Sequence, residues 1–382
     1  MLEKSHSNLS ELTLVMPTCR RQDYVFRNLE YWSKTDVKII ILDDSPKSID
    51  KEIINKLNTN ITYIHSQKSY SDRLEIAANQ INTKYAQLIC DDEFYIISAL
   101  NACIEELEKD VTIISCSGCC LKFNYKRKKN YIYSHIVYEP LTFEYNYTMI
   151  ADPIDRMSKY MENYVPFLMY GVVRSNYWKK AFKIPSKKNF NFFAYEEIQI
   201  NIFLSLAGKS KVLKQLLWLR SEENVPTRDN FIDKRQPQFL FETWWYQNEE
   251  EKKSLIQIMS KVFQEINLEI KTDFQTILNI AFKNYIKGGG GNLFKKKTYL
   301  TKKHKGIFVF CIITSVTFIK RILPNKIKKF FKSLGYFIKL QKNFYESAID
   351  LNKRGVKVDI NNLKMINQIV RKFHNIKDIS SF

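Results

Sequence analysis

Three consecutive acidic residues, Asp91, Asp92 and Glu93, follow an apolar segment at residues 85–89. Carboxylates at the end of a buried strand are unfavourable unless a cation lies beside them. Carboxylate oxygens are also the ligands that Mg²⁺ and Mn²⁺ prefer, with diphosphate oxygens and water completing the shell. One interpretation of the cluster is therefore a metal and diphosphate site. The other is a solvated acidic turn that begins the next helix.

The segments before the cluster alternate between strand and helix patterns. Short β-branched, apolar runs predict strands, and apolar residues at helical spacing between them predict helices. The predicted strands are residues 12–16, 37–42, 61–64 and 85–89, and the predicted helices are residues 21–33, 53–57 and 71–81. Such a series predicts a parallel sheet with helices on both faces.

Polar residues follow three of these strands: Pro17-Thr18, Asp43-Asp44 and the acidic cluster. In open α/β sheets, ligands bind at the carboxyl ends of the strands. Because the three polar segments meet at one edge of the predicted sheet, the metal and diphosphate interpretation gains over the acidic turn.

Later segments predict further elements. They are a helix at residues 96–107, a strand at 111–117, a hairpin at 119–137, a helix from 152 to 164, a strand at 167–173 and a helix at 196–206. From residue 237 onward the pattern is helical. These patterns predict a catalytic domain at residues 10–225, a helical extension at 237–287 and a basic helical region at 292–382.

The same segments resemble motifs of family-2 glycosyltransferases. Residues 12–21 resemble the opening strand of that family, which ends in Pro-Thr and a basic or polar pair. Residues 40–45 resemble a second motif, in which an Asp contacts the base or ribose of a nucleotide, and residues 85–94 resemble the D-x-D strand. Residues 71–74, 152–156 and 163–166 are similar to a bacterial subgroup found in surface-polysaccharide gene sets.

This resemblance implies a GT-A fold, an α/β architecture with a mostly parallel, Rossmann-like sheet. It implies an inverting glycosyltransferase that moves a sugar from a nucleotide-sugar donor to a glycan or lipid-linked acceptor. The residues expected at the donor are Pro17, Thr18, Arg20, Asp43, Asp44, Arg73 and Asp91. Many family members have Asp where this chain has Cys90, and a thiolate suits soft metals better than Mg²⁺. The metal contacts are therefore expected at Asp91, Asp92 and Glu93, with Mg²⁺ or Mn²⁺ as the ion.

An inverting transferase needs a carboxylate that takes the proton from the acceptor hydroxyl. Residues 192–200 resemble the Glu-Asp motif of the family, which places Glu197 as the base and Glu196 before it. The alternative is that both residues only begin a helix. Arg73 either reaches the diphosphate or pairs with Asp72 or Glu75, and Arg174 either binds an anionic group or begins a helix.

The net charge of +20 is concentrated in one segment, since residues 274–345 contain 16 Lys and Arg and no Asp or Glu. Without that segment the chain carries a net charge of only +4. An apolar run at 306–319 has basic residues on both sides and is too short to span a bilayer. Residues 292–340 therefore suit an anionic membrane surface, or else form a basic subdomain that packs on the catalytic domain.

The seven cysteines follow no disulfide pattern, and the polar N-terminus lacks the features of a signal peptide, so we expect a cytoplasmic protein. If the basic segment binds lipid, we expect the protein to be peripheral on the inner face of the cell membrane. Cys116 and Cys119 have C-x-x-C spacing, but no second pair completes a zinc site. A nucleic-acid-binding protein is disfavoured because the predicted groove is acidic. A nucleotidyltransferase is weaker because no glycine-rich loop follows the first strand.

Overall fold

The structure is a computed structural model of the 382-residue chain. It describes residues 8–126, 131–137, 145–185, 194–224, 245–246, 248–265, 270, 273–288 and 342–379.

Four parallel strands form the first half of a mixed sheet. They are β1 (Leu12–Thr18), β2 (Lys38–Asp43), β3 (Ile61–His65) and β4 (Tyr85–Leu88), and they lie in the order β3-β2-β1-β4. β1, β2 and β4 are almost entirely buried, as expected for strands that are covered on both faces, whereas β3 at the edge of the sheet is only partly buried. The carboxyl ends of β1 and β2 are in register, with Thr18 opposite Asp43. The polar residues that follow these two strands therefore lie side by side.

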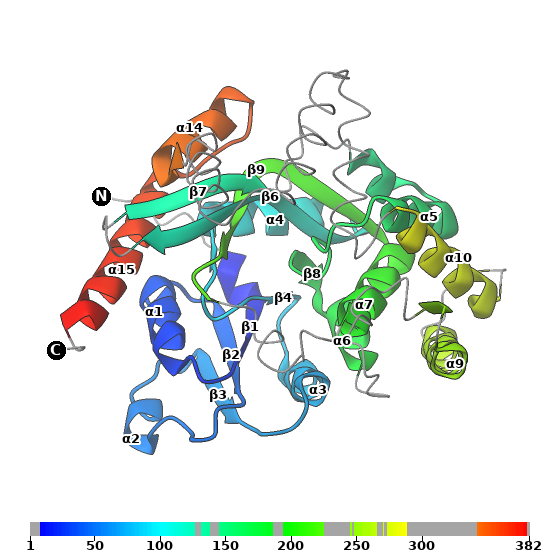
Figure 1. Ribbon diagram of the computed structural model, residues 1–382, viewed down its shortest axis with the longest axis horizontal. Helices are drawn as coiled ribbons and strands as arrows, with labels where there is room; N and C mark the ends of the chain where they lie inside the picture. Colours follow the sequence, from blue (N-terminus) through cyan, green and yellow to red (C-terminus); the bar gives the residue numbers. More distant parts are fainter. Residues whose placement is uncertain are drawn as a thin grey trace, which may run out of the picture.

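The second half of the sheet is mostly antiparallel. It contains β5 (Phe94–Tyr95), β6 (Ile113–Lys126), β7 (Tyr131–Val137), β8 (Val172–Arg174), β9 (Lys209–Ser221) and β10 (Lys342–Asn343). β8 joins the two halves, since it pairs antiparallel with both β4 and β6, and β9 runs parallel to β6. Figure 1 shows the long β6, β7 and β9 crossing above the four parallel strands.

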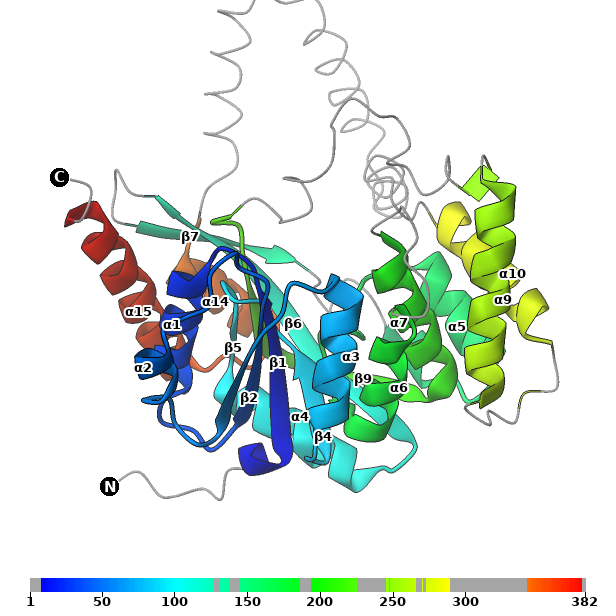
Figure 2. The same cartoon turned by 90° about the horizontal axis from the view of Figure 1, so that it is seen from below.

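Helices cover both faces of the sheet (Figures 1 and 2). On one face lie α3 (Tyr70–Gln80), α5 (Pro153–Glu162), α6 (Ser175–Lys183), α7 (Ala194–Ala207), α9 (Glu249–Glu265) and α10 (Phe274–Lys287). On the other lie α1 (Gln22–Trp32), α4 (Ile97–Lys109), α14 (Phe344–Lys353) and α15 (Ile360–Ile379). The short α2 (Lys51–Ile54) and the 3-10 turns at Asn8–Glu11 and Tyr145–Met149 connect the larger elements.

The alternation of side chains along β1 divides the core into two clusters. Leu14 and Met16 point to the face that α1 and α4 cover, whereas Val15 between them points to the face of α3 and α7. This two-residue period is that of a β-strand, and all three side chains are fully buried. The sheet therefore separates two apolar layers. The polar residues Thr18 and Asp43 lie at the carboxyl ends of its strands β1 and β2.

The α/β class and the alternation of elements in the first half are confirmed. Two details differ from the sequence prediction. Residues 113–126 form one strand, where a strand followed by a separate hairpin was expected, because β9 pairs along nearly its whole length. The strand expected at 167–173 is reduced to β8, since residues 166–170 form turns.

The end of the chain returns to the sheet. α15 packs beside α1 (Figure 1). β10 pairs with β7 and extends the sheet beyond it. The boundary expected at residue 292 therefore does not separate α14 and α15 from the α/β core. The expected membrane-surface segment at 292–340 lies outside the described residues, as do most of the four glycines after α10.

Two further observations concern the remaining sequence predictions. Cys103, Cys116, Cys119 and Cys120 are buried, as expected for small apolar side chains in the core. In the described part of the chain, none of the helices combines the length and apolar character needed to cross a bilayer.

Candidate active site

The turn after β4 holds Asp91 against the end of β1. The Thr18 hydroxyl donates a hydrogen bond to Asp91 Oδ2 at 2.8 Å, and Arg21 Nη1 lies 3.3 Å from Asp91 Oδ1. Burial raises the pKa of Asp91 to about 7, and the neighbouring Asp92 adds to this, while Arg21 and the Thr18 hydroxyl act in the opposite direction. The sequence prediction that Thr18 and Asp91 share a site therefore corresponds to a direct contact.

Asp92 lies beside Asp91 and shares the same cation. Arg21 Nη1 donates to Asp92 Oδ2 at 3.2 Å, and the side-chain amide of Asn224 donates to the same oxygen at 2.8 Å. The backbone carbonyl of Asp92 accepts a hydrogen bond from the buried guanidinium of Arg27 at 2.8 Å. Both the carboxylate and the backbone of Asp92 are thus held by residues far from it in sequence.

Glu93 faces a different environment. Its carboxylate accepts a hydrogen bond from Trp218 Nε1 at 2.7 Å and lies 3.9 Å from the Arg220 guanidinium. Burial raises the pKa of Glu93 to about 8, with a further contribution from Asp92 that Arg220 and Trp218 only partly offset. Glu93 is therefore bound to β9 through Trp218, while its carboxylate stays close enough to Asp92 for the two charges to interact.

The positions of Asp91, Asp92 and Glu93 show how well the acidic turn suits the expected divalent ion. Among the described residues, no group of three or more His, Cys, Asp and Glu side chains is arranged to hold a metal. The structure brings Asp91 and Asp92 together around Arg21 but directs Glu93 at Trp218. The two aspartates supply the hard oxygen donors that Mg²⁺ or Mn²⁺ takes, and further ligands would come from a diphosphate and water. The aspartate pair fits such an ion, whereas Glu93 does not.

The end of β2 presents two aspartates with different roles. Asp43 is saturated, because it accepts hydrogen bonds from the Gln22 amide, the Tyr63 hydroxyl and the Ser45 backbone. Burial acts to raise the pKa of Asp43, but these hydrogen bonds outweigh it and lower the pKa. Asp44 has a side chain that is 32% exposed, so it is the member of the pair that a ligand can reach.

Arg73 ties the ends of β1 and β2 together. Its guanidinium donates to the Leu42 carbonyl at 2.9 Å and to the Thr18 carbonyl at 3.5 Å, and pairs with Asp44 at 3.3 Å. The side chain is only 6% exposed. The carboxylate that pairs with Arg73 is not the expected Asp72 or Glu75, and a contact with a diphosphate stays a prediction. The observed partner is Asp44, a residue distant in sequence.

Arg20 has a strained backbone at the mouth of this site. It has φ of 57°, and its backbone N–H donates to the Ser45 hydroxyl at 2.8 Å. A left-handed conformation is unfavourable for a residue with a Cβ atom and is tolerated where the surroundings enforce it, often at functional sites. The turn that begins at Pro17 therefore holds the exposed Arg20 against Ser45.

The start of α7 holds the two glutamates in separate surroundings. Glu196 Oε1 accepts a hydrogen bond from the Ser71 hydroxyl at 2.5 Å, and Glu196 Oε2 is buried with no hydrogen-bond partner in the described part of the chain. Burial raises the pKa of Glu196, while Ser71 and Arg73 act to lower it. Glu197 Oε1 instead accepts a hydrogen bond from Tyr164 at 2.7 Å.

The remainder of α7 explains how these glutamates are positioned. Residues 198–206 of the helix are all buried, the polar ones included, so the helix is packed on every side beyond its first turn. The buried Arg156 donates to the carbonyls of Ser205 and Leu206 in its last turn and thereby satisfies groups that lack a partner within the helix. This contact gives a structural role to the Asp152–Arg156 segment singled out in the sequence.

Arg174 caps another helix. Its guanidinium donates to the carbonyls of Leu107, Asp110 and Ile113, at the end of α4 and the start of β6. The interpretation of Arg174 as a ligand for an anionic group therefore loses support. Several residues around the acidic turn, Arg21, Arg27, Trp218, Glu223 and Asn224, were not singled out from the sequence. Arg21 ends the motif at residues 12–21, whereas the other four belong to no motif and are brought to this turn only by the packing of α1 and β9.

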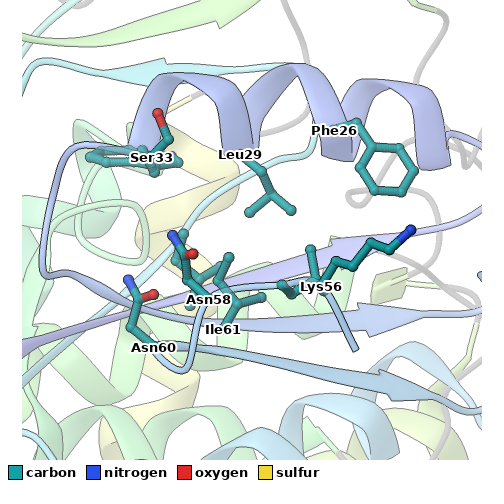
Figure 3. A pocket seen from close by; sticks show the side chains of 10 residues that line it. Phe26, Leu29, Ser33, Lys56, Asn58, Asn60 and Ile61 are labelled. Carbon is teal, nitrogen blue, oxygen red and sulfur yellow. The ribbon is translucent and has the colours of Figure 1, made fainter. Parts of the chain in front are cut away.

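A separate pocket lies between α1 and the edge of the sheet at β3. It has a volume of about 170 Å³ and is lined mostly by apolar and amide side chains, including Phe26, Leu29, Asn58 and Ile61. Figure 3 shows Phe26 and Leu29 of α1 above Asn58 and Ile61. Its lining contains no carboxylate, and it shares no residue with the acidic turn. The chemistry described above is therefore not located there.

No protein-family model and no curated protein match this sequence. Among solved structures, TarS of S. aureus (residues 1–349) in complex with UDP-GlcNAc matches with 10% identity and a TM-score of 0.46, covering 73% of this chain and 72% of that one. The mannosyltransferase PcManGT of Pyrobaculum calidifontis, in complex with GDP-Man and Mn²⁺, matches with 11% identity and a TM-score of 0.39, covering 86% and 85%. Both are glycosyltransferases. At these identities and TM-scores the likeness carries no argument about substrate or mechanism, so the functional case rests on the site itself.

Proposed function

We propose that this chain is a GT-A glycosyltransferase that moves a sugar from a nucleotide-sugar donor to a glycan or lipid-linked acceptor in surface-polysaccharide synthesis. The observation that carries the proposal is the direct contact of Thr18 with Asp91 at 2.8 Å, which joins the carboxyl ends of β1 and β4. Arg73 adds the end of β2 through Leu42 and Asp44. Three motifs that separately resemble family-2 glycosyltransferases thus form one continuous site, where an α/β sheet binds ligands.

The residues around the acidic turn suit a nucleoside diphosphate. Arg21 supplies a cation beside the turn, and the exposed Arg20 lies in the adjoining loop against Ser45. Asp44 is open to a ribose or base, whereas the saturated Asp43 holds the turn of Ser45 in place. The arginines would offset the negative charge that develops on the diphosphate as it leaves, because fixed cations stabilise such charge most in a site that excludes water.

Asp91 and Asp92 are the residues that would hold Mg²⁺ or Mn²⁺, whose chemistry there is Lewis-acid stabilisation of the leaving diphosphate. Arg21 contacts both carboxylates, so it competes with an ion for their charge or moves to the diphosphate when an ion binds. Because Arg21 can occupy the place of an ion, nucleotide binding has to be measured both with and without a divalent metal.

We assign the general base to Glu196 rather than to Glu197. A base must have an oxygen free to accept a proton, and Glu196 Oε2 has no hydrogen-bond partner among the described residues. Burial also raises the pKa of Glu196, which brings the carboxylate closer to the range in which it accepts a proton effectively. Glu197 is held by Tyr164, which itself belongs to a buried network with Asn201.

The proposed reaction is a single displacement with inversion. Glu196 takes the proton from the acceptor hydroxyl while the hydroxyl oxygen bonds to the anomeric carbon of the donor. The bond between that carbon and the diphosphate oxygen breaks at the same time, and the electron pair leaves with the nucleoside diphosphate. Glu196 ends the step protonated and returns its proton to solvent.

The test is a thermal-shift screen of the full-length protein with UDP, GDP, ADP, CDP and dTDP, each with Mn²⁺ and with EDTA. UDP and GDP are included because the structural matches hold UDP- and GDP-linked sugars. We expect one diphosphate to raise the melting temperature, since a ligand that binds only the folded state stabilises it. Stabilisation by triphosphates but not by diphosphates would favour a nucleotidyltransferase, and no stabilisation by any nucleotide would contradict the proposal.

A further inference from the structure

The guanidinium of Arg27 is buried beneath the acidic turn. Its side chain is fully inaccessible to solvent, and it divides its hydrogen bonds between the Asp92 carbonyl at 2.8 Å and Glu223 Oε2 at 2.6 Å. The rings of Tyr24 and Phe373 lie 4.5 and 5.0 Å from the guanidinium carbon. A buried cation is tolerated only where such partners replace water, so each of these contacts constrains the position of Arg27.

Glu223 connects this arginine to the last helix of the chain. Its second carboxylate oxygen contacts His374 Nε2 at 2.5 Å, and its side chain is only 3% exposed. The imidazole of His374 stacks on the Tyr125 ring, with the two centroids 4.1 Å apart and the planes 4° from parallel. The orientation of His374 is therefore fixed on one side by β6 and on the other by Glu223.

The residue after Glu223 reaches the proposed donor site. Asn224 donates to Asp92 Oδ2 at 2.8 Å, while Arg27 holds the backbone carbonyl of the same aspartate. His374 thus acts on Asp92 by two routes, one through Glu223 and Asn224 and one through Glu223 and Arg27. Neither route involves the residues that the sequence motifs identify.

We propose that His374, at the end of α15, is a positioning residue for the Asp91 and Asp92 pair, acting through Glu223, Asn224 and Arg27. The effect of His374 on donor binding rests on the proposed function. Its effect on the position of Asp91 and Asp92 does not. It makes the C-terminal helix a component of the donor site, although His374 itself contacts neither aspartate.

The rest of α15 is attached independently of this contact. Leu363, Ile366 and Val370 are buried in the core, and the Tyr31 hydroxyl of α1 donates to Asn362 at 2.7 Å. Replacing His374 therefore removes the link to Glu223 without detaching the helix. Lys372, two residues earlier, forms an exposed ion pair with Glu30 of α1 and offers a matched control on the same helix.

The first measurement is hydrogen–deuterium exchange of the full-length protein without ligand, on His374→Ala, His374→Gln and Lys372→Ala. We expect exchange about ten-fold faster for residues 91–95 and 220–224 in His374→Ala, because local opening of this network becomes easier. His374→Gln retains an N–H donor for Glu223 and should restore slow exchange, and Lys372→Ala should match the parent protein. Unchanged exchange in His374→Ala would overturn the inference. If that variant does not fold, slow exchange in His374→Gln together with fast exchange in His374→Leu supports it, and equal exchange in both overturns it.

The second measurement is the affinity of the same variants for UDP and GDP with Mn²⁺, by calorimetry. We expect about ten-fold weaker binding for His374→Ala, a size typical of coupling through a packed network, and recovery in His374→Gln. Altered exchange with unaltered affinity would overturn the part concerning the donor site. If the parent protein binds neither nucleotide, the proposed function fails on its own, and the exchange data still decide whether His374 positions the acidic turn.

Discussion

The acidic turn after β4 and the acidic start of α7 both contain consecutive carboxylates, but they distribute their partners differently. At the turn, Asp91 and Asp92 share one arginine, and Glu93 is committed to Trp218. At α7, Glu197 is committed to Tyr164, and Glu196 keeps an oxygen without a partner in the described part of the chain. In each region the carboxylates differ in how many of their oxygens have partners, and the proposed function assigns chemistry to those with fewer. Neighbours in sequence are therefore not equivalent, because successive side chains point into different surroundings.

The largest expected effect separates the two glutamates of α7. Glu196→Gln keeps a group that can accept the hydrogen bond from Ser71 but removes the proton acceptor. We therefore expect sugar transfer from the nucleotide-sugar whose diphosphate the thermal-shift screen identifies to fall about 1,000-fold, within the range for general bases. Glu197→Gln should reduce the rate of transfer much less. The measurement is the turnover rate of each variant together with its affinity for the donor, and the affinity should not change in either variant. A larger loss in Glu197→Gln would return the role of base to Glu197.

A second prediction concerns Glu223, a carboxylate with a partner on both of its oxygens, Arg27 on one and His374 on the other. Burial acts to raise the pKa of Glu223, but Arg27 and His374 outweigh it and hold the pKa below its ordinary value of 4.5. A lowered pKa contributes stability above pH 4.5 that is lost as the pH falls through the pKa of the folded state. Glu223→Gln should therefore cost about 3 kcal/mol near pH 7, since it leaves a buried arginine unpaired.

That cost should shrink as the pH falls below 4.5, and chemical denaturation of both proteins between pH 7 and pH 3.5 measures it. The control is Glu222→Gln, which alters a more exposed ion pair with Lys122 beside it. A difference between Glu223→Gln and the parent protein that stays constant across this range would contradict the assigned cause.

The third prediction distinguishes the roles of Asp92 and Glu93 in the acidic turn. Asp92→Asn should weaken binding of UDP or GDP in the presence of Mn²⁺ by about 30-fold, comparable to losses when the surroundings of a metal ligand are changed. Glu93→Gln should leave that affinity unchanged, because Glu93 faces Trp218. Calorimetry with and without EDTA makes the measurement. Equal losses in the two variants would show that Glu93 contributes to the ligand set after all.

The smallest expected effect tests the structural role of Glu93 directly. Trp218→Phe keeps an aromatic ring next to Tyr170, with which Trp218 stacks at 4.7 Å, but removes the N–H that donates to Glu93. We expect a loss of about 1 kcal/mol in the free energy of unfolding, with nucleotide affinity preserved. If Trp218→Phe unfolds like the parent protein but loses nucleotide binding, the contact between Trp218 and Glu93 serves nucleotide binding and not stability.

Much of the first half of the fold could be predicted because its signals are local. Strands β1 to β4 are short apolar runs, and α1 and α3 have apolar residues at helical spacing, so their order and parallel arrangement follow from pattern alone. The length of β6 and the existence of β9 were not predicted. Both depend on their pairing with each other, which no local pattern of the sequence contains.

By itself the sequence determined which residue types lie at the ends of β1, β2 and β4, since each polar segment follows a strand that burial makes recognisable. It also determined that Glu196 and Glu197 begin a helix. Only the tertiary structure decided which member of each acidic pair is saturated. That outcome depends on partners such as Trp218, Tyr164 and Asn224, which lie tens of residues or more from the carboxylates they contact. Hydrogen bonds between distant segments form only when the whole chain packs, and so the chemistry of these carboxylates is a property of the fold.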